Sequence, residues 1–386
     1  MSVSKTTKKL GSLIIAALLM GPVTAFADYA LNMTKSATAV GHDIYNLHML
    51  VLWICTIAGI LVFGVIIYSL INHRKSKGAQ AAQFHENTTV EVIWTTIPLI
   101  ILVAIAVPAT KTLLDYENTS NSDMTIKVTG HQWKWEYDYL DDNVADSKGI
   151  HFFSTLNKAS NDARQLGSGA DVSKVEHYLL DVDHRIVVPE GKKVRVLTTS
   201  NDVIHAWWVP QLAVKRDAIP GFINESWFKA DKVGVYRGQC AELCGKDHGF
   251  MPIVVEVKSV ADYKQWVSAE KSAAAKAEAA AAAASGKVFT MAELMAKGEE
   301  VYKANCAACH QVGGTGGGPF PALKGSPLAT TGPISEHIHR IVHGKGIMPP
   351  FGSQLSALDI AAVATYERNA WGNNTGDVVQ PSQVSK

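Results

Sequence analysis

Two apolar runs without a charged residue limit what this 386-residue chain can fold into. They cover residues 50–71 and 92–109, and each is about the length that an α-helix needs to cross the hydrocarbon core of a bilayer. The second run contains Pro98 and Pro108, which a membrane helix tolerates better than a long buried helix of a soluble protein. We therefore expect a membrane protein with a transmembrane hairpin over residues 28–115, whose spans cover about 50–71 and 92–114.

Charges between the two runs orient this hairpin. His73, Arg74, Lys75 and Lys77 lie in the connecting loop, and the outer flanks carry no comparable cluster. The positive-inside rule then places the loop in the cytoplasm and everything after the second span on the outer side. Residues 1–27 combine lysines, an apolar run and an A-x-A site, which is typical of a secretory signal peptide; the alternative, a further membrane helix, would need a longer apolar core. A net charge of +1 gives no reason to expect a nucleic-acid partner.

Beyond the membrane region the chain shows the period-two pattern of β-strands. In "GHQWKWEYDYL" the pattern predicts a strand with Trp133, Trp135, Tyr137 and Tyr139 on one face. The stretch "HYLLDVDHRIVVPEGKKVRVLTTS" predicts two strands around a Pro-Glu-Gly turn, and "MPIVVEVKS" predicts another. Several short strands indicate a β-sandwich or barrel over residues 116–268. Residues 141–175 are polar and lack a pattern, so we expect a long loop or insertion there.

The composition changes again after the predicted β domain. Residues 269–288 are an Ala-rich, low-complexity linker without an apolar stripe to bury. Residues 289–374 alternate short helical patterns with Gly- and Pro-rich loops, which predicts a small all-α domain. We expect residues 375–386 to be a disordered tail.

The small domain begins with the motif Cys306-Ala-Ala-Cys309-His310. C-x-x-C-H is the attachment signature of c-type haem, in which both thiols become thioethers and the histidine ligates the iron. Met348, in the loop "GKGIMPPF", is the candidate for the opposite axial ligand. A redox-active C-x-x-C is the alternative, but it would need a βαβ context that this segment lacks. His337, His339 and His343 are interpreted as solvated side chains.

A second sulfur-rich motif, "GQCAELCGKDHGFMP", contains Cys240, Cys244, His248 and Met251. A disulfide would leave the histidine and methionine without a role, and methionine is a poor zinc ligand. Thiolate, imidazole and thioether together are the ligands of copper electron-transfer sites. His205, in "SNDVIHAWWVP", is the candidate for a second imidazole. Two bridging thiolates, two histidines and a methionine suit two copper ions rather than one.

These motifs resemble subunit II of bacterial haem-copper cytochrome c oxidases, in the variant with a fused C-terminal cytochrome c domain. The resemblance covers residues 40–266 and includes both spans, "GHQWKWEYDY", "AWWVPQLAVKRDAIPGFINESWF" and the copper motif. It implies a cupredoxin-like Greek-key β-barrel for the copper domain. It also implies a bacterial inner-membrane location with the C-terminal domains in the periplasm.

Further residue roles follow only from this resemblance. Glu242 would offer its backbone carbonyl to copper and its carboxylate to a magnesium ion shared with subunit I. Trp133 would be the point of electron entry, and Glu91 would lie at the mouth of a proton channel of subunit I. Lys134 departs from the family, which usually has an aromatic residue at this position. Asp138, Asp141, Asp142 and Asp146 could dock a cationic cytochrome, although an ordinary solvated charge run is the better default.

The resemblance implies an electron-entry subunit of a terminal oxidase. Electrons from a cytochrome c or another upstream donor would pass through haem c and the copper pair to subunit I, which reduces oxygen to water with proton translocation. The expected partners are subunit I, subunit III, the donor and membrane lipid. His48 and His73 are the only histidines near the spans and suit interfacial positions, so this chain cannot build an oxygen-reducing site alone. The alternatives are a subunit of a copper-containing nitric oxide reductase and a tethered periplasmic electron carrier. A nitrous oxide reductase would need a further histidine-rich domain, and a quinol oxidase subunit would lack the copper ligands.

Overall fold

The computed structural model describes residues 32–384, apart from residues 84, 166 and 353. The predicted signal peptide, residues 1–27, lies outside the described residues. Contacts divide the chain into two units, residues 1–112 and 113–386, and each is described by itself.

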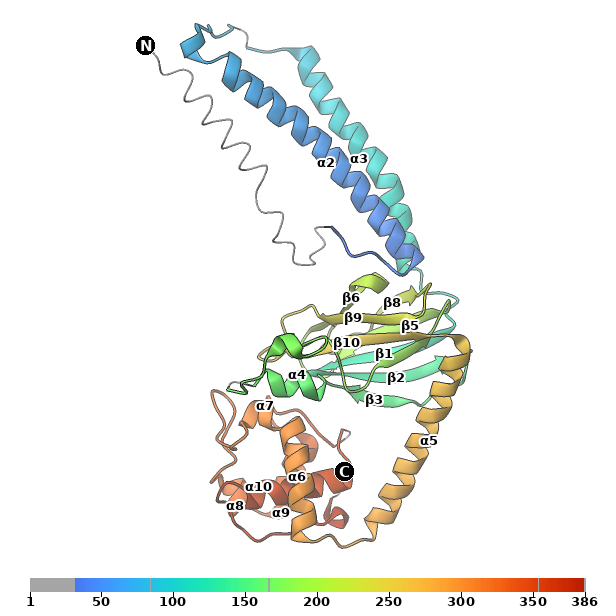
Figure 1. The fold of residues 1–386 in the computed structure, drawn as a ribbon, viewed down its shortest axis with the longest axis vertical. Helices are drawn as coiled ribbons and strands as arrows, with labels where there is room; N and C mark the ends of the chain where they lie inside the picture. The colour runs from blue at the N-terminus through green and yellow to red at the C-terminus, as the bar shows by residue number, and fades with distance from the viewer. Residues whose placement is uncertain (1–31, 84, 166, 353, 385–386) are drawn as a thin grey trace. The chain divides into compact units, whose positions relative to one another are not determined.

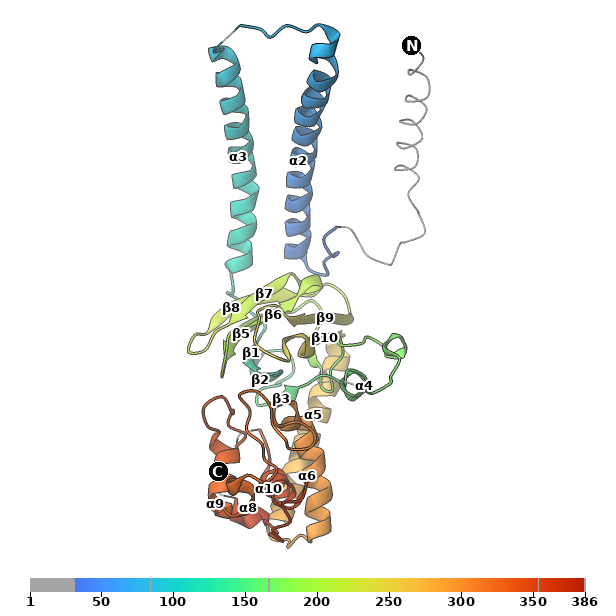
Figure 2. The same cartoon turned by 90° about the vertical axis from the view of Figure 1, so that its left-hand side faces the viewer.

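Two long helices make up the first unit, and the second of them continues to Glu117 (Figures 1 and 2). Helix α2 covers Ala39–Asn72, and α3 covers Thr88–Glu117 and runs through both prolines. The loop between them contains the 3₁₀ turn η1, Lys75–Lys77, so the basic cluster lies in the connection between the two helices, as predicted. Both helices are longer than the predicted spans because polar residues at their ends continue the helical hydrogen bonding. At α2 the Thr38 side chain caps the first turn by accepting a hydrogen bond from the amide of Gly41.

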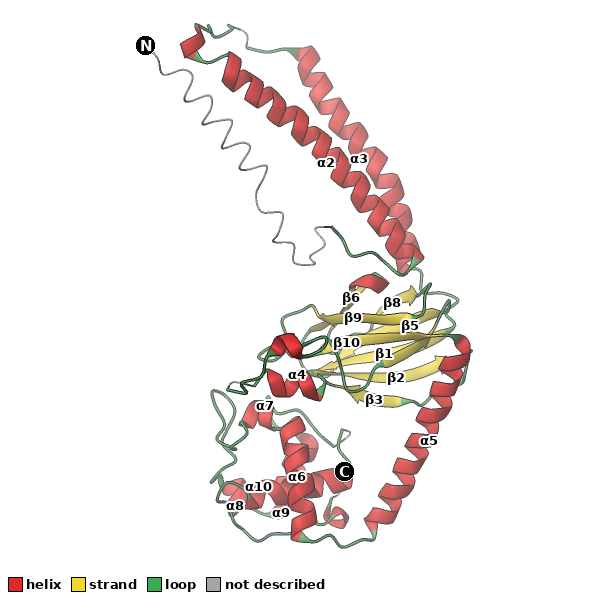
Figure 3. Ribbon diagram, in the orientation of Figure 1, coloured by secondary structure: helices red, strands yellow, loops and turns green. Residues whose placement is uncertain are grey.

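Ten strands follow, in two five-stranded sheets (Figure 3). The first sheet has the order β3-β2-β1-β5-β8 and the second β4-β10-β9-β6-β7. The pairing of β1 with β5 and of β4 with β10 is parallel, and the other pairs are antiparallel. The strands are β1 Met124–His131, β2 Lys134–Asp142, β3 His151–Ser154, β4 Ile186–Pro189, β5 Lys193–Ser200, β6 His205–Val209, β7 Val214–Ala218, β8 Asn224–Lys229, β9 Gly234–Cys240 and β10 Pro252–Lys258.

The β core comes from the strand residues that alternate inward. In β5 every second residue is buried, and Trp135, Tyr137 and Tyr139 of β2 have at most 1% of their surface exposed. Trp207 of β6 stacks on Phe228 of β8 with ring centroids 6.3 Å apart. These large apolar side chains supply most of the driving force for folding this domain. The predicted β-sandwich is therefore present.

Three details of the β domain differ from the sequence-based expectation. Trp133 lies in the turn between β1 and β2 rather than on the strand face, because the alternation continues through a tight turn. The two strands around the Pro-Glu-Gly turn, β4 and β5, belong to different sheets. Residues 141–175 are not all loop, because β3 pairs with β2 and the short helix α4, Lys158–Ala163, follows it.

Helix α5, Val260–Ser285, covers much of the predicted linker. The C-terminal region after it is helical, with α6 Met291–Asn305, α7 Ala307–His310, α8 Pro327–Thr330, α9 Ile334–His343 and α10 Ala357–Asn369. Capping boxes start α6 at Thr290 and α10 at Ser356. Gly298 lets the two helices touch, since a Cβ there would lie 2.1 Å from the carbonyl oxygen of Ala362.

The expectation of a disordered tail is wrong for the described residues up to 384. Val379 is fully buried, and Asp377 pairs with Arg368 at 2.7 Å. A short 3₁₀ turn, η5 Pro381–Gln383, follows. The polar composition of the segment gave no sign of this packing, which a few apolar residues provide: Val379 and Pro381 are buried, and Val384 packs against the core of the helical domain.

Candidate metal and haem sites

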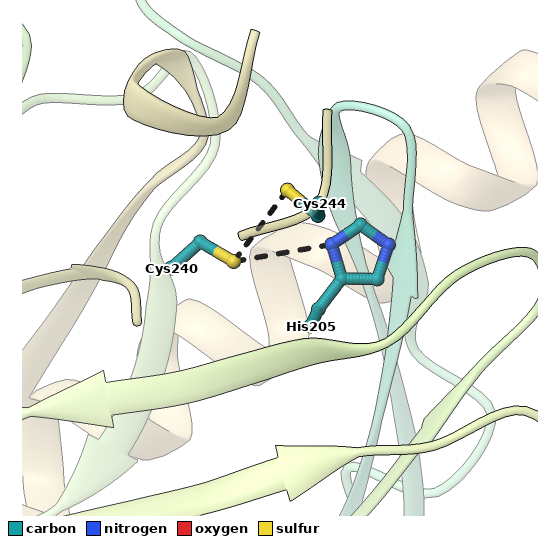
Figure 4. A group of neighbouring side chains, drawn as sticks. All are labelled: His205, Cys240 and Cys244. Carbon is teal, nitrogen blue, oxygen red and sulfur yellow. Dashed lines mark hydrogen bonds between the residues drawn. The ribbon is translucent and has the colours of Figure 1, made fainter. Parts of the chain in front are cut away.

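The sulfur-rich motif folds into a compact cluster at one end of the second sheet (Figure 4). Cys240 is the last residue of β9, and His205 is the first residue of the neighbouring β6. The Sγ atom of Cys240 lies 3.9 Å from Nδ1 of His205 and 3.8 Å from Sγ of Cys244. His205 is fully buried, and Cys240 and Cys244 are 4% and 2% exposed. Three predicted ligands thus converge although 35 residues separate the histidine from the first cysteine.

The remaining members lie on the other side of Cys244. Its Sγ atom is 3.4 Å from Nδ1 of His248 and 3.6 Å from Sδ of Met251. The backbone carbonyl oxygen of Glu242 lies 3.3 Å from Sγ of Cys240, while the Glu242 side chain is exposed. The turn η4, His248–Phe250, carries the histidine back toward the cysteine, and β10 begins directly after Met251. All the predicted copper-site residues therefore come together.

The donor atoms fit a soft metal rather than a disulfide. Both cysteines are free, and a sulfur–sulfur distance of 3.8 Å is far longer than the bond of about 2.05 Å in a disulfide. Two sulfurs from cysteine, two imidazole nitrogens and a thioether sulfur are a set that copper prefers over zinc. With both thiolates able to bridge, the five side chains offer enough donors for a pair of ions.

Hydrogen bonds and burial shift the pKa values of the two cysteines and of His205. The hydrogen bond from Cys244 lowers the pKa of the Cys240 thiol, against the cost of burial. The same interaction, together with burial, raises the pKa of the Cys244 thiol. Burial alone would lower the pKa of His205, but hydrogen bonds with Asp202 and Cys240 raise it overall. A metal cation would replace the shared proton between the sulfurs.

Asp202 fixes the orientation of the buried imidazole. Its Oδ1 atom lies 2.8 Å from Nε2 of His205, which leaves Nδ1 directed at Cys240. The carboxylate also accepts hydrogen bonds from the backbone amides of Gln132 and Val203, both at 2.7 Å. Gly130 provides room for the ring, since a Cβ there would lie 2.6 Å from Cδ2 of His205. Sequence reasoning missed this support, and the short spacing between Asp202 and His205 was its only signal.

Trp133 contacts the ligand loop directly. Its indole Nε1 donates to the carbonyl oxygen of Cys244 at 3.1 Å, and the Gln132 side chain donates to the same oxygen at 2.9 Å. Gly245, with φ of +114°, allows this approach, because a Cβ would lie 3.2 Å from Cζ2 of Trp133. The unusual Lys134 places its ammonium group 4.6 Å from the ring centre of Phe153. Lys134, where the resemblance led us to expect an aromatic side chain, thus makes a cation–π contact.

The haem motif lies between α6 and the following loop. Cys306 is the C-cap of α6, and α7 carries Cys309 and His310. Nδ1 of His310 lies 2.8 Å from the carbonyl oxygen of Pro321, an arrangement that orients an axial imidazole and leaves Nε2 for a metal. Cys306 and Met348 both pack against the apolar core of the helical domain. These residues fit a covalently attached haem.

Other predicted residues lie apart from both sites. Glu91 is in the first turn of α3, and its carboxylate accepts a hydrogen bond from the Asn87 amide at 3.4 Å. His48 pairs with Asn32, and His73 is the C-cap of α2. The interpretation of His337 as solvated is wrong, because it is 2% exposed, whereas His339 and His343 are exposed.

Three of the four acidic residues named in the sequence analysis have side-chain partners: Asp138, Asp142 and Asp146. Asp142 accepts from Tyr263 at 2.8 Å, and Asp146 pairs with Lys271 at 3.0 Å. Side-chain oxygens of Glu136 and Asp138 and Nε2 of His151 lie within 4.8 Å of one another, and a hypothetical cation could bridge them. However, both carboxylates already have partners: His131 and His151 for Glu136, and Lys127 for Asp138. The group is therefore an ion-pair network.

A membrane hairpin, a β-sandwich with a thiolate–imidazole–thioether cluster and a C-x-x-C-H helical domain define a membrane-anchored electron-transfer protein. Matches to protein-family models agree with this class. Residues 124–258 match the periplasmic domain of cytochrome c oxidase subunit II, and residues 27–112 match its transmembrane domain. Residues 293–366 match subunit III of the cbb3-type oxidase.

Similar proteins match 40–64% of this chain. A probable cytochrome c oxidase subunit 2 of Rickettsia bellii is 41% identical over 63% of this chain and 84% of its own length. Subunit 2 of Arabidopsis thaliana is 36% identical over 64% of this chain and 92% of its own. Among solved structures, the periplasmic domain of subunit II of cytochrome oxidase from Bradyrhizobium japonicum is 41% identical in sequence, with a TM-score of 0.34. The match covers 40% of this chain and 98% of the solved chain.

The chain belongs to the cytochrome c oxidase subunit II family. The fold class expected from the sequence is confirmed: a transmembrane hairpin, a cupredoxin-like domain and a cytochrome c domain. Membership implies copper in the β domain, and the separate match of residues 293–366 implies haem in the helical one. It also implies a part in electron entry into a membrane-bound haem-copper oxidase, together with other oxidase subunits and a cytochrome c donor.

Proposed function

We propose that the chain accepts electrons from a cytochrome c or another upstream donor and delivers them to subunit I, which reduces oxygen to water with proton translocation. Haem c and a pair of copper ions, when bound, supply the one-electron carriers along this path. The observation that carries the proposal is the 3.8 Å approach of the Cys240 and Cys244 sulfurs, with an imidazole nitrogen beside each. That arrangement favours two ions bridged by both sulfurs.

Each part of the chain has a defined task in this proposal. Cys240, Cys244, His205, His248, Met251 and the Glu242 carbonyl would hold the two coppers, which would supply a one-electron carrier there. Burial of the sulfurs excludes water from the metals, and the network around Asp202 holds the ligands still, which keeps reorganisation on electron transfer small. Trp133, hydrogen-bonded to Cys244, provides the entry point for electrons. Cys306 and Cys309 would attach haem c, and His310 and Met348 would ligate its iron.

Contacts with the partner subunits form a second part of the proposal. The exposed Glu242 carboxylate binds a magnesium ion shared with subunit I, and Glu91 lies at the mouth of a proton channel of that subunit. Leu243, between the two bridging cysteines, is 78% exposed, and such an apolar surface suits burial against another subunit. Subunit III completes the complex in the bacterial inner membrane, with the C-terminal domains in the periplasm.

The test is the metal content and visible spectrum of the full chain in detergent. Two coppers per chain, haem c bands and a near-infrared band would support the proposal. Met251→Leu should perturb the near-infrared band, whereas Met33→Leu at an exposed methionine should not. His310→Ala should abolish the native haem spectrum, and His339→Ala should leave it unchanged. Haem without copper, or a Cys240–Cys244 disulfide in the active protein, would refute the copper assignment.

The alternatives differ in what the assembled complex does. A nitric oxide reductase subunit would copurify with a partner that consumes nitric oxide in preference to oxygen. A tethered carrier would bind its cofactors but copurify with no catalytic subunit. Purification of the complex through a tag on this chain, followed by oxygen and nitric oxide electrode measurements, separates the three.

A further inference from the structure

The insertion at residues 141–175 has no part in the function proposed above, yet it contacts the copper motif. Its short helix, α4, ends at the C-cap residue Arg164. The Arg164 guanidinium lies against the turn η4, which begins at His248 and leads directly into Met251. Two of the predicted copper ligands therefore lie at the two ends of the turn that this arginine contacts.

Arg164 makes two different contacts with this turn. Its Nη1 atom lies 3.5 Å from Oδ1 of Asp247, the residue before His248. Its guanidinium carbon lies 4.2 Å from the ring centre of Phe250, the residue before Met251. A planar guanidinium can stack on an aromatic face and pair with a carboxylate at the same time, whereas the ammonium group of a lysine is a single point charge. The arginine therefore contacts both ends of η4.

The carboxylate of Asp247 depends on this pairing. The side chains of Asp247 and Arg164 are 7% and 18% exposed, so solvent screens the pair only weakly. Among the described residues, Arg164 is the cation that pairs with Asp247. Removing one partner of a buried pair is strongly unfavourable, because the remaining charge is left without compensation. Without the arginine, the Asp247 carboxylate would have to move toward water, and the neighbouring His248 would move with it.

The arginine is also held from its own side. Its Nε atom donates to the side-chain oxygen of Asn161 at 2.8 Å, and its backbone amide donates to the carbonyl oxygen of Ser160 at 3.0 Å. Ser160 is fully buried, and its hydroxyl accepts a hydrogen bond from the Leu179 amide at 3.1 Å. Asn157 caps the start of α4 by accepting from the Ser160 amide at 2.9 Å. These hydrogen bonds fix α4, and with it the position of the guanidinium.

We propose that Arg164 is a positioning residue for the copper pair and acts through Asp247 and Phe250. It fixes the turn η4, and with the turn it fixes the ligands His248 and Met251. The insertion thereby gives these two ligands a support of their own, separate from the carboxylate that orients the buried imidazole. Groups that orient metal ligands in this way commonly set the affinity of the site. The inference rests on the copper site of the proposed function.

The test is copper binding by the full chain in detergent, measured by competition with a chromophoric chelator, together with the near-infrared band. Arg164→Gln should weaken copper binding about tenfold, the lower end of the usual effect of losing a group that orients a metal ligand. It should also shift the band, because the imidazole and thioether donors change position. Arg195→Gln is the matched control, since Arg195 of β5 pairs with Glu225 of β8 at 2.6 Å in the other sheet. It should change neither quantity.

Two further measurements address the route through the turn. In the metal-free chain, hydrogen exchange at the Phe250 amide, which donates to the Asp247 carbonyl oxygen at 2.9 Å, should be faster in Arg164→Gln than in the wild type. In the Asp247→Asn background, Arg164→Gln should weaken copper binding less than it does in the wild type, because the buried charge is already absent.

Wild-type copper affinity and an unshifted band in Arg164→Gln would overturn the inference. An equal loss of affinity with and without Asp247→Asn would also overturn it, since the arginine would then not act through the carboxylate. If Arg164→Gln does not fold, Arg164→Lys replaces it: this variant keeps the charge and loses the planar group, so it should show smaller changes of the same kind, and wild-type values would refute the role. Failure of the copper assignment is distinguishable, because the wild-type chain would then bind no copper while hydrogen exchange would still report on the turn.

Discussion

Replacing Asp202 with asparagine should weaken copper binding without removing any ligand. In the structure Oδ1 of Asp202 accepts from His205 and from the Val203 amide, and Oδ2 accepts from the Gln132 amide. An asparagine side chain has only one acceptor oxygen, so the donors that face either Oδ1 or Oδ2 of Asp202 must lose their hydrogen bond. If the amide nitrogen of the asparagine faces the ring, Nε2 of His205 must accept a hydrogen bond, and the ring proton moves to Nδ1. Nδ1 is the atom that faces Cys240, so it can then no longer bind a metal.

The expected loss is about 10- to 100-fold in copper affinity, the usual effect of removing a group that orients a metal ligand. This corresponds to about 1.4–2.7 kcal/mol. Competition with a chromophoric copper chelator, on the full chain in detergent, measures it. Asp231→Asn makes the same chemical change at an exposed position of the same domain and should bind copper normally. If Asp202→Asn binds as tightly as the wild type while His205→Ala does not, the orienting role of Asp202 is refuted.

Three further changes test other parts of the structure. Gly298→Ala should destabilise the helical domain by about 1–3 kcal/mol in urea unfolding, because its Cβ would collide with the Ala362 carbonyl, whereas Gly286→Ala meets open space and should be neutral. Trp133→Phe, which cannot donate to Cys244, should slow reduction of the copper centre by a cytochrome c donor in stopped-flow traces at unchanged copper content; an unchanged rate would exclude this entry point. For Glu136, burial would raise the pKa, but hydrogen bonds from His131 and His151 lower it below its ordinary 4.5, and the same contact raises the pKa of His151 above 6.5. The unfolding free energy of the wild type should therefore exceed that of Glu136→Gln most clearly near pH 4.5–6.5. This difference should shrink in acid, where Glu136 becomes protonated, and again above the raised His151 pKa, where the imidazole loses its charge. A difference that does not depend on pH would contradict this reasoning.

The metal ligands were predictable because most of them are close in sequence. Four of the five side chains fall within residues 240–251, where residue types alone indicate the chemistry. Their support was not predictable, since Asp202 and Gln132 meet only after β1 pairs with β5 in parallel. Parallel pairing between distant strands leaves no local signal.

Two errors have similar physical causes. The alternation around Trp133 continues through a turn, so periodicity could not show where the strand ends. His337 looked like a surface residue because its partner, Glu367, comes from another helix 30 residues away. In both cases the decisive contact is long-range, and the local pattern was compatible with a simpler structure.

The ligands come from the start of β6, the end of β9 and the connection that follows β9, and this has a consequence for how such a site can arise or be lost. The large core residues, such as Trp207, Phe228 and Ile253, lie on the strands themselves. Residues 241–251 mainly join β9 to β10, so they can be exchanged for another connection while the packing of the sheets is kept. Rewriting this one stretch of the gene is therefore enough to delete the redox centre, whereas grafting one onto the scaffold also requires the histidine at the start of β6 and the cysteine at the end of β9.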